Sequence, residues 1–369
     1  MNKISMHHKC IYLADIVLFG LMCGISLFAV SELFVNREIT AKWFGLILTV
    51  SFAGILWHIL HRNVYAPVQP VFMLIAACLI LVPLRDGYVS GFNLRLLIFP
   101  GGLLLMLYFL IQMTETYPAS DSFRLITAVV VGMAGYGLLQ YAGIFRTLNP
   151  NFRITGGFDN PAGFAAALSI TLPYAVYLIR ETAGRTRYIS MAAFAVILSA
   201  IVLSGSRAAV TACLVVAVCY LCCRFSGIKL RKWMPLAIAV LLIASAIMLY
   251  FLKKDSADGR LLIWQRTWDM IRDHPMMGHG QGAFQAKYML YQAGYFEAYP
   301  DSRYASLADN VLHPFNEYLL VWSEHGIAGL CIFALLGFML IRSYHRSPDF
   351  TKFIAGLSLL AVVVFSFFS

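Results

Sequence analysis

Residues 309–330, "DNVLHPFNEYLLVWSEHGIAGL", bring titratable side chains to the start of an otherwise apolar run. The spacing of His313, Glu317 and Glu324 places these three residues on one face of a helix. Since proline suits the first helical position, Pro314 predicts a helix with His313 at its mouth. The positive end of the helix dipole favours neutral imidazole, and a neutral imidazole accepts a proton as a general base must.

The sequence leaves the roles of these side chains open. Glu317 opposes the dipole, because a nearby carboxylate favours the charged form of imidazole. His313 at a membrane boundary can equally be an interfacial residue without a catalytic role. A carboxylate within a membrane span is costly, so we expect Glu324 to face the protein interior or a cavity, for structural pairing or for substrate contact.

A second candidate site is "VLSGSRAAV" at residues 202–210. Ser206 can cap the following span, which places Arg207 in its first turn, at the unfavourable end of the helix dipole. Free amides, the dipole and a cation together form a good anion pocket. The alternative is a boundary arginine that extends to the interface without a ligand. Arg260 is a second cation predicted on the same outer side.

A third candidate site is "RITGGFDNPAGFA" at residues 153–165. Its glycines and Pro161 predict a turn that leads into a span. Asp159 and Asn160 can either hydrogen-bond sugar hydroxyls or cap the helix, and capping is the interpretation we favour.

The composition predicts that membrane-spanning helices position these residues. Hydrophobic residues make up 60% of the 369-residue chain and charged residues 12%, whereas a soluble domain would need roughly twice that charge. The sequence therefore predicts an all-α polytopic membrane protein with the lipid bilayer as its main solvent. Because lysines and arginines gather in cytoplasmic loops, the net charge of +10 does not require nucleic acid, and no base-stacking motif or basic tail is present.

Apolar runs predict the membrane spans. The first run is longer than the core of a signal peptide and shows no small-residue cleavage site, so we interpret it as a span. The final run predicts either a further helix beyond Ser369 or one misassigned span. The predicted spans are 11–35, 43–60, 68–84, 94–114, 123–145, 162–180, 188–204, 207–223, 233–252, 315–341 and 352–369.

The distribution of basic residues predicts the orientation. With the N-terminus inside, the inner segments hold about twice as many lysines and arginines as the short outer segments. This orientation places the long polar loop 253–314 outside, between helices at 1–252 and C-terminal helices at 315–369. Apolar residues recur within the loop with the spacing of an amphipathic helix, at Leu261, Ile263, Trp264, Trp268 and Ile271.

The loop lacks the signals of a metal or nucleotide site. The eight cysteines lie in or beside apolar runs, and His274, His279 and His313 have neither convergent cysteines nor a His-x-x-x-His spacing. "GHGQG" at 278–282 resembles a dinucleotide fingerprint, but no strand precedes it. We therefore expect no cofactor and no metal, and we interpret these glycines as a tight turn in which the backbone passes close to other elements.

Four segments in order resemble the O-antigen ligase and polymerase superfamily, which includes bacterial protein O-oligosaccharyltransferases. They are "GFDNPAGFA", "SGSRAAV", "GRLLIWQRTWDMIRDHPMMGHGQGAF" and "HPFNEYLLVWSEHGIAGL", within roughly residues 150–340. The resemblance implies a bundle of the GT-C type, with about 11–12 spanning helices and a long periplasmic loop. It departs from the family where Pro314 follows His313 in place of asparagine, and where the first motif reads "NPAG" although the family often has Asn-Pro-Asn.

The resemblance also implies roles for individual residues. Arg207 and Arg260 would hold the diphosphate of an undecaprenyl-diphosphate glycan donor, and His313 would take the proton from the acceptor hydroxyl. Transfer would invert the anomeric centre without a metal, at the periplasmic face of the bacterial inner membrane. Possible supporting residues are Glu317, Asn316, Glu324, Asn160 and Arg266.

The acceptor is the least determined partner. Ligation onto lipid A-core is our leading hypothesis, and polymerisation of repeat units or transfer to protein are alternatives within the same chemistry. A lipid or solute transporter is the alternative from another class. Transporters often show inverted repeats and interrupted helices, and neither is evident in the sequence.

Overall fold

The computed structural model describes residues 6–28, 95–225 and 254–368, together with isolated positions at 45, 49, 52, 73, 75–77, 236 and 240. The predicted spans 43–60, 68–84 and 233–252 lie outside the continuously described segments. Across the described segments the chain forms helices and connecting turns, with no strand.

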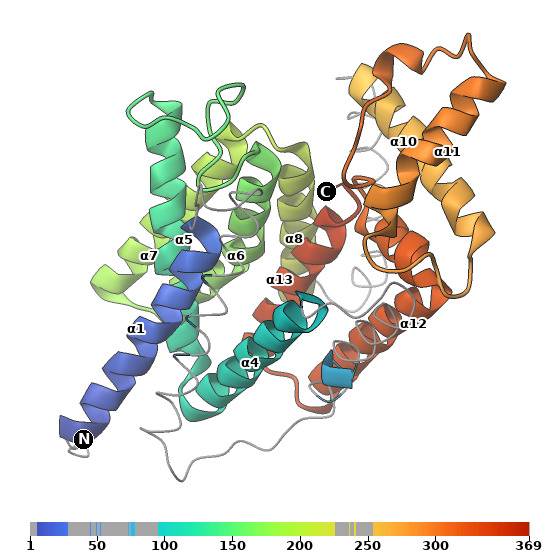
Figure 1. Cartoon of the computed structure of the whole chain (residues 1–369). Helices are drawn as coiled ribbons and strands as arrows, with labels where there is room; N and C mark the ends of the chain where they lie inside the picture. Colours follow the sequence, from blue (N-terminus) through green and yellow to red (C-terminus); the bar gives the residue numbers. More distant parts are fainter. Residues whose placement is uncertain are drawn as a thin grey trace. The chain divides into compact units, whose positions relative to one another are not determined.

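Outside the predicted loop 253–314, the helices in the described segments follow the predicted spans closely; Figure 1 shows the helices. In chain order they are α1 (Met6–Phe28), α4 (Arg95–Thr116), α5 (Ala119–Tyr141), α6 (Pro161–Glu181), α7 (Gly184–Leu203), α8 (Arg207–Phe225), α10 (Lys254–Asp273), α11 (Ala283–Ala298), the 3₁₀ turn η1 (Ala305–Leu307), α12 (Glu317–Arg346) and α13 (Phe350–Phe365).

Four of these helices, α5, α6, α7 and α12, are long and apolar enough to cross a membrane. Shorter apolar helical stretches occur at Tyr12–Leu21, Pro100–Gln112, Arg207–Cys223 and Phe350–Phe365. The predicted class, an all-α polytopic membrane protein, is therefore confirmed.

The chain divides into two compact units. Unit 1 comprises Met1–Ser206 and Asp349–Ser358, and unit 2 comprises Arg207–Pro348 and Leu359–Ser369. In unit 1, α5, α6 and α7 pack against one another and α1 packs against α5. The core of unit 1 includes Met133, Phe164, Leu168 and Ile197, all fully buried.

In unit 2, α10 packs against both α11 and α12 (Figure 1). The core of this assembly comprises Ile263, Met270, Phe284 and Tyr288. The amphipathic helix predicted in the loop is present as α10. Leu261 and Trp268 remain 37% and 42% exposed, while the fully buried Thr267 occupies the face that packs inward.

Helix α12 is broken at Gly326, which has φ 65° and ψ −167°. The backbone groups freed by the break pair with the loop that follows α10. The carbonyl oxygens of Ser323 and Glu324 accept hydrogen bonds from the amides of His279 and Gly280, at 2.9 and 2.8 Å. In the opposite sense, the amides of Ile327 and Ala328 donate to the carbonyls of Pro275 and Met276, at 2.9 and 3.3 Å. The interruption thus leaves these backbone groups satisfied, as burial in an apolar environment requires.

The predicted turn of glycines is confirmed at this crossing. Gly278, Gly280 and Gly282 all have positive φ. A Cβ atom on Gly278 would lie 2.3 Å from the carbonyl carbon of Glu324. Only glycine allows the loop backbone to approach α12 so closely.

Candidate functional site

The turn that carries His313 precedes α12 rather than beginning it. The helix starts at Glu317, and the Asn316 side chain caps it by accepting hydrogen bonds from the amides of Tyr318 and Leu319, at 3.0 and 3.1 Å. The predicted helix start at Pro314 was therefore wrong, and His313 does not share a helical face with Glu317 and Glu324. The side-chain oxygen of asparagine accepts hydrogen bonds from the unpaired amides of the first turn, whereas proline has no side-chain acceptor. The cap therefore determines where the helix begins.

Helix α10 holds the 313–316 turn in place. The indole N–H of Trp264 donates to the carbonyl oxygen of Pro314 at 2.9 Å. The Arg260 guanidinium lies over the ring of Phe315, 5.1 Å from its centroid. His313 itself is exposed, and so is Glu317, whose backbone amide donates to Ser366 at 2.9 Å. The turn therefore presents an accessible imidazole beside the helix that carries Arg260.

Arg207 and Arg260 are close enough for their charges to interact. Arg207 is the first residue of α8, as predicted, and is partly buried. The pKa of Arg260 is lowered, first by burial and then by the positive charge of Arg207. Among the described residues, Arg260 makes no ion pair with a carboxylate, and its Nη1 donates to the carbonyl oxygen of Phe368 at 3.1 Å. Because arginine does not give up its proton near neutral pH, this arrangement favours a bound anion.

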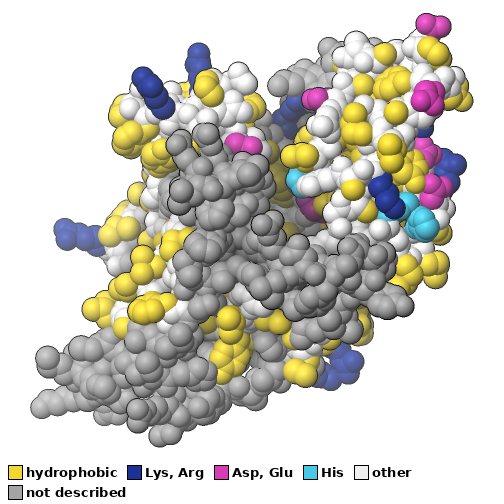
Figure 2. Space-filling model, viewed as in Figure 1, with side chains coloured by type: hydrophobic (Ala, Val, Ile, Leu, Met, Phe, Trp, Pro, Cys, Tyr) yellow, Lys and Arg dark blue, Asp and Glu magenta, His cyan; other side chains and the backbone are white. Residues whose placement is uncertain are grey.

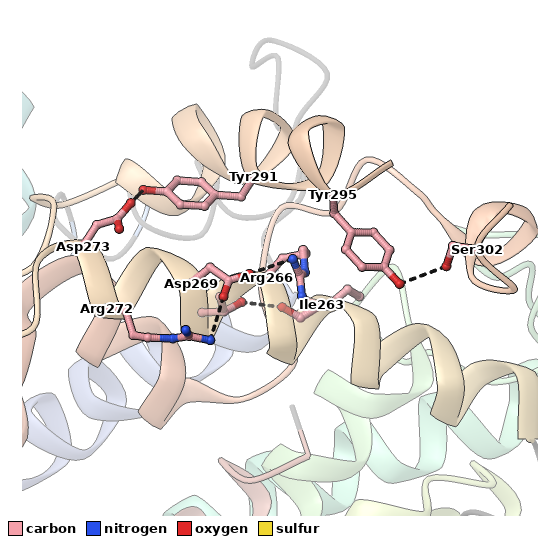
Figure 3. Close-up of polar contacts among 9 residues, drawn as sticks. Ile263, Arg266, Asp269, Arg272, Asp273, Tyr291, Tyr295 and Ser302 are labelled. Carbon is pink, nitrogen blue, oxygen red and sulfur yellow. Dashed lines mark hydrogen bonds and ion pairs between the residues drawn. The ribbon is translucent and has the colours of Figure 1, made fainter. Parts of the chain in front are cut away.

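Arg266 makes its contacts within the α10–α11 assembly. Its guanidinium forms an ion pair with Asp269 at 2.7 Å and lies over the ring of Tyr295, 4.3 Å from its centroid (Figure 3). Asp269 also pairs with Arg272 at 3.0 Å. Arg266 is therefore held among residues of the loop helices.

Glu324 faces the protein interior, as predicted. Its side chain is 8% exposed, and Oε1 accepts a hydrogen bond from the amide of Phe284 at 3.3 Å. Phe284 lies in the first turn of α11, where a carboxylate stabilises unpaired amides and the positive end of the dipole. The geometry favours structural pairing over substrate contact for this residue.

Asn160 belongs to unit 1, whereas the other candidate residues belong to unit 2. Its side chain caps α6 by accepting a hydrogen bond from the amide of Gly163 at 2.9 Å. The favoured interpretation as a helix cap is confirmed.

Gln140 in α5 organises the loop before α6 and was missed in the sequence. Its Oε1 accepts from the amides of Thr155 and Gly156 at 3.1 and 2.8 Å, and its Nε2 donates to the carbonyl of Gly156 at 3.1 Å. A polar residue in an apolar span signals such pairing, and that signal was present at Gln140.

The contacts of His279 in the loop indicate which ring nitrogen carries its proton. His279 Nδ1 lies 3.2 Å from Lys287 Nζ, and its Nε2 lies 2.9 Å from the carbonyl oxygen of Met270. Because a lysine ammonium only donates, Nδ1 accepts and Nε2–H donates to Met270. Burial is the main reason that the pKa of His279 is lowered. Among the described residues, no group of three or more His, Cys, Asp and Glu side chains could hold a metal ion.

Figure 2 shows that most of the carboxylates visible in that view lie over the α10–α11 part of unit 2. A groove of about 540 Å³ also lies on unit 2, lined by residues of α10 and by Leu319. It includes Arg266 but not Arg207, Arg260 or His313. Two of its lining residues, Trp264 and Trp268, were predicted only as parts of an apolar face.

Comparison with known proteins finds one family match, and it covers the region that contains Arg207, Arg260 and His313. Residues 192–334 match a family model described as O-Antigen ligase. The matched region contains Arg207, Arg260 and His313, together with α10 and α11. No curated protein and no solved structure matched the chain. Residues 192–334 are therefore similar to the O-antigen ligase family, in agreement with the resemblance seen in the sequence motifs.

Proposed function

We propose that the protein transfers a glycan from an undecaprenyl-diphosphate donor to an acceptor hydroxyl at the periplasmic face of the bacterial inner membrane. Lipid A-core is the acceptor we favour, which makes the activity O-antigen ligation. One observation carries the proposal. Arg207 and Arg260 interact as two partly buried cations, and the turn bearing His313 packs on the helix of Arg260.

The two guanidiniums account for binding and departure of the diphosphate. A diphosphate ester gains negative charge as its bond to the sugar breaks, and fixed cations stabilise that charge in the transition state. Arg260 is partly removed from water, which strengthens its interaction with an anion. A bound anion would also offset the repulsion between Arg260 and Arg207.

His313 supplies the base for the acceptor. As the acceptor oxygen attacks the anomeric carbon, its proton moves to the imidazole, the new carbon–oxygen bond forms and the bond to the diphosphate breaks. The electron pair of the broken bond leaves on the diphosphate oxygen. Attack from the face opposite the leaving group inverts the anomeric centre. A positioned base of this kind contributes about 10²–10⁴-fold to the rate.

The break in α12 is the feature that favours the transporter alternative, because interrupted helices form substrate sites in transporters. In those proteins the freed backbone groups bind ions or substrate. Here the groups around Gly326 pair with the backbone of residues 275–280. The break therefore supports a role in attaching the loop to α12. Glycan transfer from a diphosphate donor accounts for the two interacting arginines better than transport does.

The test is a reconstituted assay with purified protein in lipid nanodiscs, an undecaprenyl-diphosphate glycan, and neither nucleotide nor added metal. Lipid A-core, a growing glycan and a peptide are offered as separate acceptors. His313→Ala should lower kcat by about 10²–10⁴-fold, while the thermal unfolding midpoint stays unchanged because the side chain is exposed.

Arg346→Ala is the matched control, since Arg346 is an exposed arginine at the end of α12. Unchanged turnover by His313→Ala would remove the histidine from the mechanism. Absence of transfer to all three acceptors by the wild-type protein would refute the proposed function.

A further inference from the structure

The groove along α10 combines aromatic and charged walls. Its volume of about 540 Å³ lies within the range of small-molecule sites, roughly 300–1,000 Å³. The lining residues that matter here are Trp264, Gln265, Arg266, Trp268, Asp269 and Arg272. The lining includes none of Arg207, Arg260 and His313.

Two indole rings in the groove are held in fixed orientations. Trp264 is anchored through its N–H to the carbonyl oxygen of Pro314, and that proline follows His313. Trp268 packs edge to face on Trp322, with ring centroids 5.2 Å apart and an interplanar angle of 90°. Trp322 is tied in turn to the carbonyl oxygen of Pro275 at 3.3 Å. Trp264 and Trp268 are separated by one helical turn and therefore form a strip along α10.

A polar strip adjoins the aromatic one. Gln265, Asp269 and Arg272 follow one another at the spacing of a second helical face. Asp269 pairs with both Arg266 and Arg272 (Figure 3), which brings the three charged groups together along α10. Such a pair still offers further donors and lone pairs to neutral hydroxyl groups.

This combination matches the chemistry of a sugar ring. A pyranose has an apolar face of C–H groups, which packs on an indole, and a rim of hydroxyls, which hydrogen-bonds to amide, carboxylate and guanidinium groups. A lipid tail would satisfy only the indoles and would leave three charged side chains in an apolar environment, which is costly.

We propose that the α10 groove binds sugar rings of the glycan substrate, an inference that rests on the proposed function. The spacing along α10 connects the groove to the reacting groups. Arg260, Trp264 and Trp268 follow one another at four-residue intervals, about 6 Å apart along the helix axis. Because Arg260 belongs to the proposed diphosphate site and Trp264 contacts the turn of His313, a glycan leading away from either reacting partner can follow this strip.

The test compares Trp268→Ala with the wild-type protein in the reconstituted assay. Loss of the exposed indole should raise KM for one substrate about tenfold, with kcat unchanged. A change in donor KM assigns the groove to the donor glycan, and a change in acceptor KM assigns it to the acceptor. Trp268→Phe should restore part of the affinity, and Arg272→Gln, at a 67% exposed side chain, should raise the same KM.

Leu290→Ala is the control, because Leu290 is an apolar residue on α11 that is 70% exposed and lies outside the groove. Both KM values unchanged in Trp268→Ala and Arg272→Gln would overturn the inference. A loss of liposome flotation without a change in KM would overturn it too, since the groove would then contact the membrane.

A direct binding measurement separates this inference from the proposed function. Free oligosaccharides released from the envelope glycans of the source bacterium are mixed with the wild-type protein and observed by saturation-transfer NMR. Transfer to sugar protons that disappears in Trp268→Ala supports the groove even if no glycan transfer is detected. Absence of any saturation transfer in the wild-type protein contradicts it.

Discussion

Gly278 and Gly326 meet where the loop after α10 crosses the break in α12. A Cβ atom on Gly326 would lie 2.2 Å from the carbonyl oxygen of Met276, and one on Gly278 would lie 2.3 Å from the carbonyl carbon of Glu324. Both glycines have φ near +65°. The crossing joins the loop helices to α12 through backbone contacts that leave no space for a side chain.

Substitution at the crossing should destabilise the protein strongly. Gly326→Ala combines a strained φ with overlap against backbone atoms, so we expect a loss of about 3 kcal/mol or more of unfolding free energy. Thermal unfolding in detergent should show a lower midpoint and a lower yield of folded protein. Gly337→Ala is the matched control, because no heavy atom lies within 4 Å of a Cβ at that position of α12. Equal midpoints for the two variants would mean that the crossing is dispensable.

Inorganic pyrophosphate should stabilise the wild-type protein. An anion that binds only the folded state at a concentration 100-fold above its Kd stabilises it by about 2.7 kcal/mol. Arg207→Gln and Arg260→Gln should each abolish the rise in the thermal midpoint, since each removes one cation of the pair. Arg346→Gln should retain it. A rise that persists in both of the first two variants would place the anion elsewhere on the protein.

The Asn316 cap should contribute to the stability of α12. Asn316→Ala leaves the amides of Tyr318 and Leu319 without their acceptor, at a cost of about 0.5–2 kcal/mol. Asn316→Ser should recover most of this loss, because serine also accepts hydrogen bonds at an N-cap. Thermal unfolding of the three proteins side by side provides the measurement, and identical midpoints for the alanine variant and wild type would contradict the role of the cap.

Stability should fall in mild acid through His279. Its pKa is lowered in the folded state, chiefly by burial, so the folded protein resists protonation that the unfolded chain accepts. The stabilising contribution of neutral His279 is complete above the unfolded pKa of about 6.5 and is lost as the pH falls through the lower folded value.

The measurement for His279 is the thermal midpoint between pH 8 and pH 5. His279→Gln should show a shallower decline than the wild-type protein, because glutamine does not titrate. His313→Gln is a suitable control, since that imidazole is exposed. Parallel curves for the wild-type protein and His279→Gln would assign the acid sensitivity to other groups.

The sequence by itself determined the helical membrane class and most of the described helix boundaries. The penalty for an unpaired backbone in lipid leaves few structures that an apolar run can form. Local rules also predicted Arg207 in the first turn of α8, Asn160 as a cap and the glycine turn at 278–282. Each of these depends on neighbours close in the chain, which the sequence displays directly.

Only the tertiary structure determined which residues far apart in the sequence contact one another. The break at Gly326 could not be foreseen, because it is stabilised by the carbonyls of Pro275 and Met276, roughly fifty residues earlier in the chain. The helix begins at Glu317 rather than at the predicted Pro314, because the Asn316 side chain caps the first-turn amides. The interaction of Arg207 with Arg260 likewise joins residues on two helices far apart in the sequence, which no local pattern encodes.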